Sequence, residues 1–122
     1  MKLEKLNCNM SICRVSDLSG FDLNAGFFFI GKTDEEISLV CQTEHVPSNT
    51  LERDDGWQGF RIAGILDFSL VGILSKLSAI LAENEIGIFA VSTYNTDYIL
   101  VKAENFDRAM DVFSAAGYEV EK

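Results

Sequence analysis

A stripe of large aliphatic side chains in the second half of the chain constrains the fold more than any other feature. Its members recur three or four residues apart, which is the spacing of one face of an α-helix. They are Leu70, Ile73, Leu74, Leu77, Ile80 and Leu81. Ser69 precedes the stripe, and its short hydroxyl can accept a hydrogen bond from an unpaired amide of the first turn. We therefore predict a helix that begins at Ser69, ends near Glu85 and buries one apolar face.

Extended segments border this predicted helix on both sides. The large apolar residues of the upstream segment are Trp57, Phe60, Ile62 and Ile65. They predict a strand that ends at the loop after Gly64. Downstream, two mostly apolar runs at residues 86–92 and 98–102 flank the polar residues Asn95 and Thr96, which predicts a β-hairpin.

A second amphipathic helix and a short strand complete this half of the chain. The apolar face of the second helix is Phe106, Ala109, Met110 and Phe113. Gly117 stops the helix, because a left-handed residue after a helix end costs least as glycine, and residues 118–120 form the last strand. The resulting order, β-α-β-β-α-β, predicts an α+β fold built on a ferredoxin-like unit.

The first half predicts strands without a full helix. Residues 6–12 alternate between apolar and polar, the pattern of a strand with one buried face. Residues 27–31 and 37–41 are β-forming runs that predict a hairpin. Residues 43–56 contain Pro47 and two adjacent aspartates and are the least regular part, so at most one short helical turn fits there.

The two predicted hairpins align without gaps when residues 27–42 are laid over residues 87–102. The matched pairs are Phe29 with Phe89, Thr33 with Thr93, Leu39 with Ile99, Val40 with Leu100 and Cys41 with Val101. Upstream, an Asp-x-Ser sequence lies ten residues nearer its hairpin in the first half (27−17=10 against 87−67=20). We interpret this as an internal duplication whose first copy has lost its helix. The alternative is that any two apolar hairpins align this well.

The charge of the chain excludes two classes of partner. Ten basic and nineteen acidic residues give a formal net charge of −9, which repels the phosphates of nucleic acids and the anionic surface of a membrane. No apolar run approaches the ~20 residues that span a bilayer, and the first residues lack the apolar core of a signal peptide. We expect no nucleic-acid partner, no membrane partner and a cytoplasmic location.

Cysteine and histidine usage gives little support to a metal site or an enzyme. Cys8, Cys13 and Cys41 lack CxxC spacing and are most simply core residues, and His45 is the only histidine. We predict no metal and no cofactor. A small enzyme using Cys13 or Cys41 with His45 is an alternative, but a thiolate needs a base beside it, and His45 lies in a separate polar loop.

The sequences ILDFSLVG at residues 65–72 and STYNTDYILV at residues 92–101 resemble those of ACT-domain proteins. The chain is most similar to small stand-alone tandem-ACT proteins, which are related to the regulatory ACT domains of aspartate kinases and to CASTOR-type arginine sensors. The resemblance implies a truncated ACT-like half at residues 1–56 and a complete ACT domain at residues 57–122. It also implies antiparallel sheets with helices on one face, side-by-side pairing into a homodimer, and an amino acid bound at the pairing interface. ACT domains are regulatory and do not catalyse.

The chemistry of the 64–72 loop suits a free amino acid. The start of a helix directs unpaired amides and the positive end of its dipole at a carboxylate. Asp67 can meet the ammonium group, while Gly64 and Gly72 leave room for a close approach. The resemblance implies ligand contacts from a loop glycine, an acid, the helix start and a Thr-aromatic-x-x-Asp run. These residues are Gly64, Asp67, Ser69, Leu70, Thr93, Tyr94 and Asp97.

Each of these residues also has a structural explanation. Asp67 and Ser69 can cap the helix, and Thr93 and Asp97 can serve the strand and the turn. We therefore predict a non-catalytic sensor of a free amino acid, with a basic one as a candidate. The alternative is a ligand-free oligomerisation module that pairs through exposed strand edges.

Overall fold

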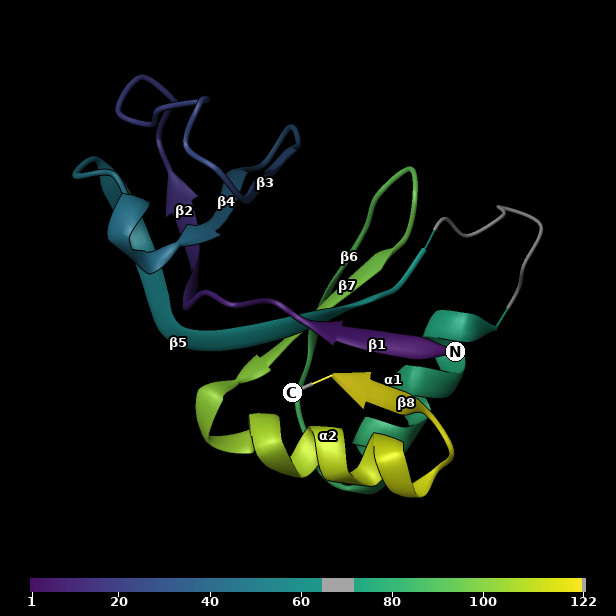
Figure 1. The fold of residues 1–122 in the computed structure, drawn as a ribbon. Helices are drawn as coiled ribbons and strands as arrows, with labels where there is room; N and C mark the ends of the chain where they lie inside the picture. The colour runs from purple at the N-terminus through teal and green to yellow at the C-terminus, as the bar shows by residue number, and fades with distance from the viewer. Residues whose placement is uncertain (65–71, 122) are drawn as a thin grey trace. The chain divides into compact units, whose positions relative to one another are not determined.

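A computed structural model describes residues 1–64 and 72–121 of the chain (Figure 1). The chain divides into two compact units. The helical unit consists of Met1–Asn7 and Gln58–Lys122, and the inserted unit consists of Cys8–Trp57. The first residues of the chain therefore pack with the second half, whereas the sequence interpretation placed them with the first.

The helical unit follows the predicted βαββαβ order. Its elements are the second part of β5 (Thr50–Ile62), α1 (Ile73–Glu83), β6 (Phe89–Ser92), β7 (Asp97–Lys102), the 3-10 turn η2 (Ala103–Asn105), α2 (Phe106–Ala115) and β8 (Glu119–Glu121). The strand order in this unit is β6-β7-β5-β1-β8, with β1 (Lys2–Lys5) inserted between β5 and β8. Leu3 lies opposite Ile62 in an antiparallel pair and opposite Val120 in a parallel pair. The sheet is thus mixed.

Both helices of this unit pack on one face of its sheet. The buried core combines residues of α1 and α2 with inward-facing residues of the strands, such as Leu3 and Ile62. Its fully buried side chains include Phe60 and Phe113, whose rings meet edge to face at 5.2 Å between centroids. The predicted apolar stripe forms the inner face of α1, where Leu77 and Leu81 are buried and Ile73, Leu74 and Ile80 pack beside them.

The ends of the helices test two sequence predictions. Gly117, at φ +97°, follows α2 as predicted. The predicted start of the first helix at Ser69 is wrong, because α1 begins at Ile73 and is preceded by Gly72 at φ +80°. A left-handed backbone conformation costs little free energy only for glycine, and at Gly72 it interrupts the helical conformation. The aliphatic spacing does not show this interruption, so the predicted helix began too early. Ser69 and Leu70 themselves lie outside the described residues.

The inserted unit is a small sheet in the order β3-β4-β2-β5. Its elements are β2 (Met10–Val15), β3 (Phe28–Lys32), β4 (Ile37–Gln42), the 3-10 turn η1 (Thr43–His45) and the first part of β5. Its core contains Cys13, Val15, Phe21, Leu39 and Cys41. No α-helix is present within Cys8–Trp57, all of which is described. The predicted absence of a full helix from this part of the first half is therefore confirmed.

Two strand predictions in the first half were wrong. Residues 6–12 do not form one strand, because β1 ends at Lys5 and β2 begins at Met10. The polar residues 50–56 are not irregular, since they form the first part of β5. Cross-strand pairs such as Arg14 with Glu52, whose Nε···Oε1 distance is 3.1 Å, stabilise a strand that apolar periodicity cannot detect.

The two hairpins have the same spacing and the same pairs, as the predicted internal duplication requires. β4 starts at Ile37 and β7 at Asp97, a shift of 97−37=60 residues, and η1 and η2 follow at the same shift. Phe29 pairs with Val40 where Phe89 pairs with Leu100. The two hairpins therefore share one register, as predicted.

Candidate functional site

The structure describes only part of the predicted loop site. Gly64 follows β5 at φ +93°, a conformation that favours glycine. Apart from its chain neighbours, no atom of the described residues lies within 4 Å of the position that a Cβ would take there. Asp67, Ser69 and Leu70 lie outside the described residues, so their predicted roles stay predictions.

The hairpin turn between β6 and β7 is fixed to the end of β5. Thr96 is 6% exposed, and its hydroxyl donates to the backbone carbonyl of Ile62 at 2.9 Å. The Thr93 hydroxyl donates to the Thr96 carbonyl at 3.0 Å, and the Thr93 amide donates to the same carbonyl at 2.9 Å. These bonds bring the turn against the segment that leads into Gly64.

The other predicted hairpin residues have different surroundings. The Asp97 carboxylate accepts a hydrogen bond from the Ser92 hydroxyl at 2.6 Å, across the β6–β7 pair. Tyr94 is 79% exposed at the turn. The hydroxyl of Thr93 and one carboxylate oxygen of Asp97 are thus engaged within the hairpin, and Tyr94 is largely exposed.

A hollow of about 260 Å³ lies where Gly64 and the hairpin turn meet. It is lined by Glu4, Arg61, Ile62, Gly64, Asn95, Thr96 and Tyr98. Nε and Nη2 of Arg61 both donate to Oε2 of Glu4 at 3.3 Å. Hydrogen bonds to Tyr98 first, and then to Glu4, raise the pKa of Arg61, so its guanidinium stays charged.

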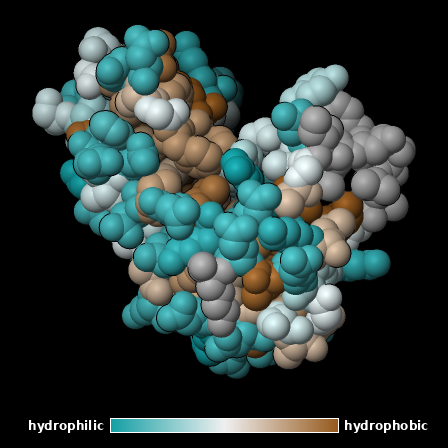
Figure 2. Space-filling view, viewed as in Figure 1, coloured by the Kyte–Doolittle hydropathy of each residue, from teal (hydrophilic) through white to brown (hydrophobic). Residues whose placement is uncertain are grey.

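The charged pair lies on the sheet face opposite the helices. Ile62 points into the helical core, so Arg61 and its cross-strand partner Glu4 point to the other face. Figure 2 shows hydrophilic residues over β1 in this view. Sequence reasoning missed both residues. Alternation along β5 could have identified Arg61 as outward-facing, but no local signal placed Glu4 beside it, because β1 was not predicted.

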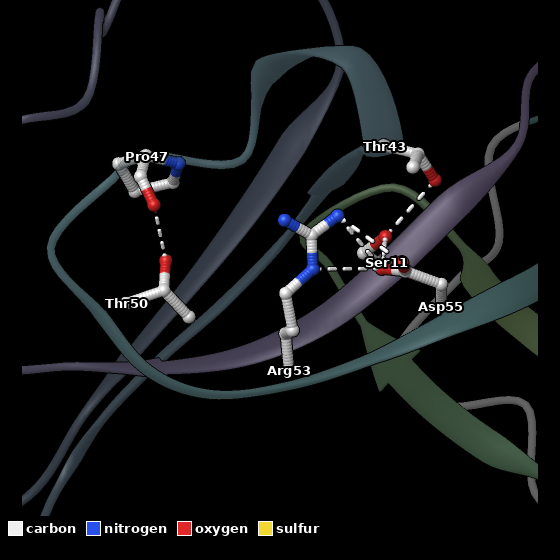
Figure 3. A network of polar contacts seen from close by, with 6 residues as sticks. All are labelled: Ser11, Thr43, Pro47, Thr50, Arg53 and Asp55. Carbon is white, nitrogen blue, oxygen red and sulfur yellow. Dashed lines mark hydrogen bonds and ion pairs between the residues drawn. The ribbon is translucent and has the colours of Figure 1, made fainter.

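A second polar group lies in the inserted unit (Figure 3). The Ser11 side chain is fully buried, and its hydroxyl lies 2.6 Å from Asp55 Oδ1 and 2.9 Å from Thr43 Oγ1. Arg53 forms an ion pair with Asp55 at 3.0 Å. At the start of β5, the strand that carries Arg53 and Asp55, the Thr50 hydroxyl donates to the Pro47 carbonyl at 2.6 Å. This network satisfies a buried hydroxyl, which would otherwise destabilise the unit.

The buried thiols oppose the enzyme alternative. Burial raises the pKa of Cys13, and it raises the pKa of Cys41 to about 12 with a contribution from the neighbouring Cys13. A thiol of this kind carries almost no thiolate near neutral pH. His45 is exposed, and its Nε2 lies 3.9 Å from Oε1 of Glu44. Within residues 1–64 and 72–121, no three His, Cys, Asp or Glu side chains are grouped to hold a metal ion.

The family follows from comparison with known proteins. The model of the ACT domain family matches residues 52–115, more than half of the chain. The chain therefore belongs to the ACT domain family. The comparison with curated protein sequences found no match. No helix in the described part of the chain is long and apolar enough to cross a membrane.

Solved structures agree with this assignment. The protein Atu0741 from Agobacterium tumefaciens is 33% identical at a TM-score of 0.85, and the match covers 98% of this chain and 91% of that one. VC0802 from Vibrio cholerae, described as a possible transport protein, is 19% identical at a TM-score of 0.78, and the match covers 98% of this chain and 88% of that one. The aspartate kinase of Clostridium acetobutylicum is 14% identical at a TM-score of 0.69, and the match covers 93% of this chain and 33% of the kinase chain. The last two likenesses show the fold alone.

Proposed function

We propose that the chain is a non-catalytic regulatory module that binds a free amino acid beside Gly64, acting in the cytoplasm as a homodimer. The observation that carries this proposal is the bond from the Thr96 hydroxyl to the Ile62 carbonyl. It holds the hairpin turn against the segment that enters the 64–72 loop. Gly64, which begins the predicted loop, and the turn residues Asn95 and Thr96 therefore line one hollow.

The family supports a regulatory role. ACT domains commonly bind small ligands, and this fold occurs in an aspartate kinase that is described as an allosteric enzyme. The buried, protonated thiols remove the strongest candidate nucleophiles. A module without a nucleophile can still change a partner's activity by binding a ligand better in one assembly state than in another.

Within this proposal the loop and the turn have different tasks. Asp67 meets the ligand ammonium group, and the backbone around Ser69 and Leu70, which precedes α1 in the sequence, receives its carboxylate. Gly64 leaves space for the ligand, and Tyr94 offers a ring face to its side chain. Thr93 and Asp97 hold the turn and contribute their remaining hydrogen-bonding capacity.

The inserted unit supplies the truncated half of the tandem. It repeats the hairpin of the helical unit without a helix. We propose that it presents an edge strand, β3, for pairing with a neighbouring ACT unit, because β3 hydrogen-bonds only β4 in the described sheet order.

Calorimetric titration with each of the twenty common amino acids tests the proposal. We expect one or a few to bind the wild type, and Asp67→Asn to weaken that binding by about tenfold or more, as for one lost charge-assisted bond. Asp107→Asn, which removes an exposed acid from α2, is the matched control and keeps the wild-type affinity. Absence of binding by the wild type would exclude a sensor of these amino acids.

One observation favours a second function, a ligand-free oligomerisation module. The Thr93 hydroxyl and one oxygen of Asp97 are already bonded within the hairpin, as a purely structural turn requires. Under this alternative, light scattering after gel filtration gives the same dimer with and without amino acids. Asp67→Asn then leaves both the dimer and the melting temperature unchanged.

A further inference from the structure

The inserted unit has a hollow of its own, on the sheet face opposite its core. This Ser38 hollow has a volume of about 260 Å³. The residues that line it include Ile12, Arg14, Glu36, Ser38, Glu52 and Asp54. Arg14 pairs with Ser38 on β4 and with Glu52 on β5, so the three side chains project from one face. The intervening pair, Cys13 and Leu39, points to the other face and into the core.

The internal duplication explains why this face is hollow. The cross-strand pair Gly31–Ser38 corresponds to the pair Val91–Tyr98 of the helical unit, at the shift of 91−31=60 residues. A valine and a tyrosine side chain are thus replaced by a hydrogen atom and a hydroxymethyl group. A Cβ built at Gly31 would lie 3.9 Å from the Cβ of Ser38, so it would fit without conflict. The hollow is therefore space that small residues leave on the sheet.

Both units keep an arginine–glutamate pair at this place in the sheet. In the inserted unit Nε and Nη2 of Arg14 both donate to Oε1 of Glu52, across β2 and β5. In the helical unit Arg61 makes the equivalent pair with Glu4, across β5 and β1. The charge of Arg14 is balanced within the sheet, so this pair does not decide what the Ser38 hollow can bind.

Acidic residues distinguish the inserted unit from its duplicate. Glu36 occupies the position of Thr96, and Asp54 lies opposite Ile12 on β5. Arg53 also lines the hollow, but its guanidinium forms an ion pair with Asp55 at 3.0 Å (Figure 3). Cys8–Trp57 contains nine acidic and three basic residues, a formal charge of −6 out of the −9 of the chain. The electrostatic potential here attracts a cation.

We propose that the Ser38 hollow is a docking site for a partner protein, from which a basic segment inserts an arginine or lysine side chain. Ile12 is half-buried in the lining and packs against the methylene stem of that side chain. Glu36 accepts one hydrogen bond from Ser38 at 2.9 Å, and a carboxylate can accept about four. A second copy of this chain is a poor occupant, because two chains of charge −9 repel each other. The inference goes beyond the proposed function, since it needs no bound ligand.

Fluorescence anisotropy tests the inference with a labelled peptide of alternating arginine and glycine, titrated with the full chain at low salt. We expect saturable binding that weakens as salt is added, because exposed ion pairs are screened. The matching peptide of alternating glutamate and glycine should not bind. Glu36→Gln and Asp54→Asn should each weaken binding of the basic peptide about two- to fivefold, as for exposed ion pairs.

Two matched controls separate the hollow from general charge attraction. Glu104→Gln combined with Asp107→Asn removes the same charge from exposed positions of η2 and α2, and it should keep the wild-type affinity. Ser38→Tyr keeps every carboxylate but fills the hollow with the side chain of the duplicate, so it should weaken binding at least as much as Glu36→Gln. Ser38→Ala keeps the space and should keep most of the affinity. Melting temperatures verify that each variant is folded.

Several results would overturn the inference. They are absence of binding by the wild type, equal weakening by the hollow and control substitutions, and an unchanged affinity of folded Ser38→Tyr. Displacement of the peptide by spermidine of equal affinity would assign the hollow to a small polyamine instead. None of these results bears on amino acid binding beside Gly64, which the proposed function requires.

Discussion

The bond from Thr96 to Ile62 gives a prediction whose size can be worked from the structure. Thr96→Val replaces the hydroxyl by a methyl group and removes a 2.9 Å hydrogen bond to a carbonyl at a site where Thr96 is 6% exposed. A buried acceptor that loses its donor costs about 1–3 kcal/mol. We therefore expect the free energy of unfolding to fall by about 1–3 kcal/mol.

Urea denaturation followed by circular dichroism measures this change. The slope for a small protein is about 1–3 kcal/mol/M, so the midpoint should fall by roughly 1 M with the slope unchanged. Thr96→Ser is the control, because it keeps the hydroxyl and loses one methyl group, worth about 0.8 kcal/mol. The valine variant should therefore be the less stable of the two.

The difference in unfolding free energy between Thr96→Val and Thr96→Ser tests whether the Thr96 hydroxyl holds the turn. If Thr96→Val is as stable as the wild type, or more stable than Thr96→Ser, the hydroxyl does not hold the turn to β5. The reasoning that brings the turn and Gly64 to one site would then fail. If the proposed function is right, Thr96→Val should also weaken amino acid binding, because the turn loses its fixed position.

Three further predictions concern packing, the thiols and pH. Gly59→Ala would place a methyl group in steric overlap with Leu100 Cδ2 and 3.1 Å from the Ile99 backbone oxygen, so thermal melting should show a loss of stability of about 1–3 kcal/mol. An unchanged melting temperature would contradict this packing. At pH 8 iodoacetamide should modify the partly exposed Cys8 well before Cys13 and Cys41, while mass spectrometry after denaturation should show all three modified; equal rates in the folded protein would refute the burial argument. Hydrogen bonds from Ser19 lower the pKa of Asp17, so its contribution to stability is present above about pH 4 and is lost as the pH falls through the lowered pKa. Asp17→Asn should therefore flatten the acid limb of the stability–pH curve, and an unaltered limb would argue against this linkage.

Local sequence patterns were sufficient to predict those helices and strands that bury one face. The 3.6-residue spacing located the inner face of α1 through Leu77 and Leu81, and the alternation of the hairpins fixed a register that both copies share. Gly117 marked the end of α2, because glycine is the residue that most readily adopts the positive φ found there. The ACT fold could therefore be predicted from periodicity, turn residues and the resemblance of residues 65–72 and 92–101.

Features that depend on distant partners could not be predicted. The first part of β5 is polar, and its pairing with β2 through Arg14 and Glu52 is visible only after folding. Residues 6–12 alternate between apolar and polar without a break, yet they do not form one strand. The Leu6 amide donates to the Gly59 carbonyl at 2.9 Å, and Leu6 belongs to a different unit from Met10. For the same reason Glu4 could not be predicted as a residue of the candidate site, since its position beside the hollow depends on β1 pairing with β5.

The position of β1 between β5 and β8 has a consequence for synthesis on the ribosome. The inserted unit, Cys8–Trp57, is contiguous in sequence, so all of its strands are made before the second half of the chain. The sheet of the helical unit cannot close at that stage, because Leu3 must wait for Val120. A stretch of more than a hundred residues separates these two partners, and such long-range pairings form slowly. β1 is therefore without its neighbour β8 until the residues between them have been made, and the sheet that carries Glu4 closes only then.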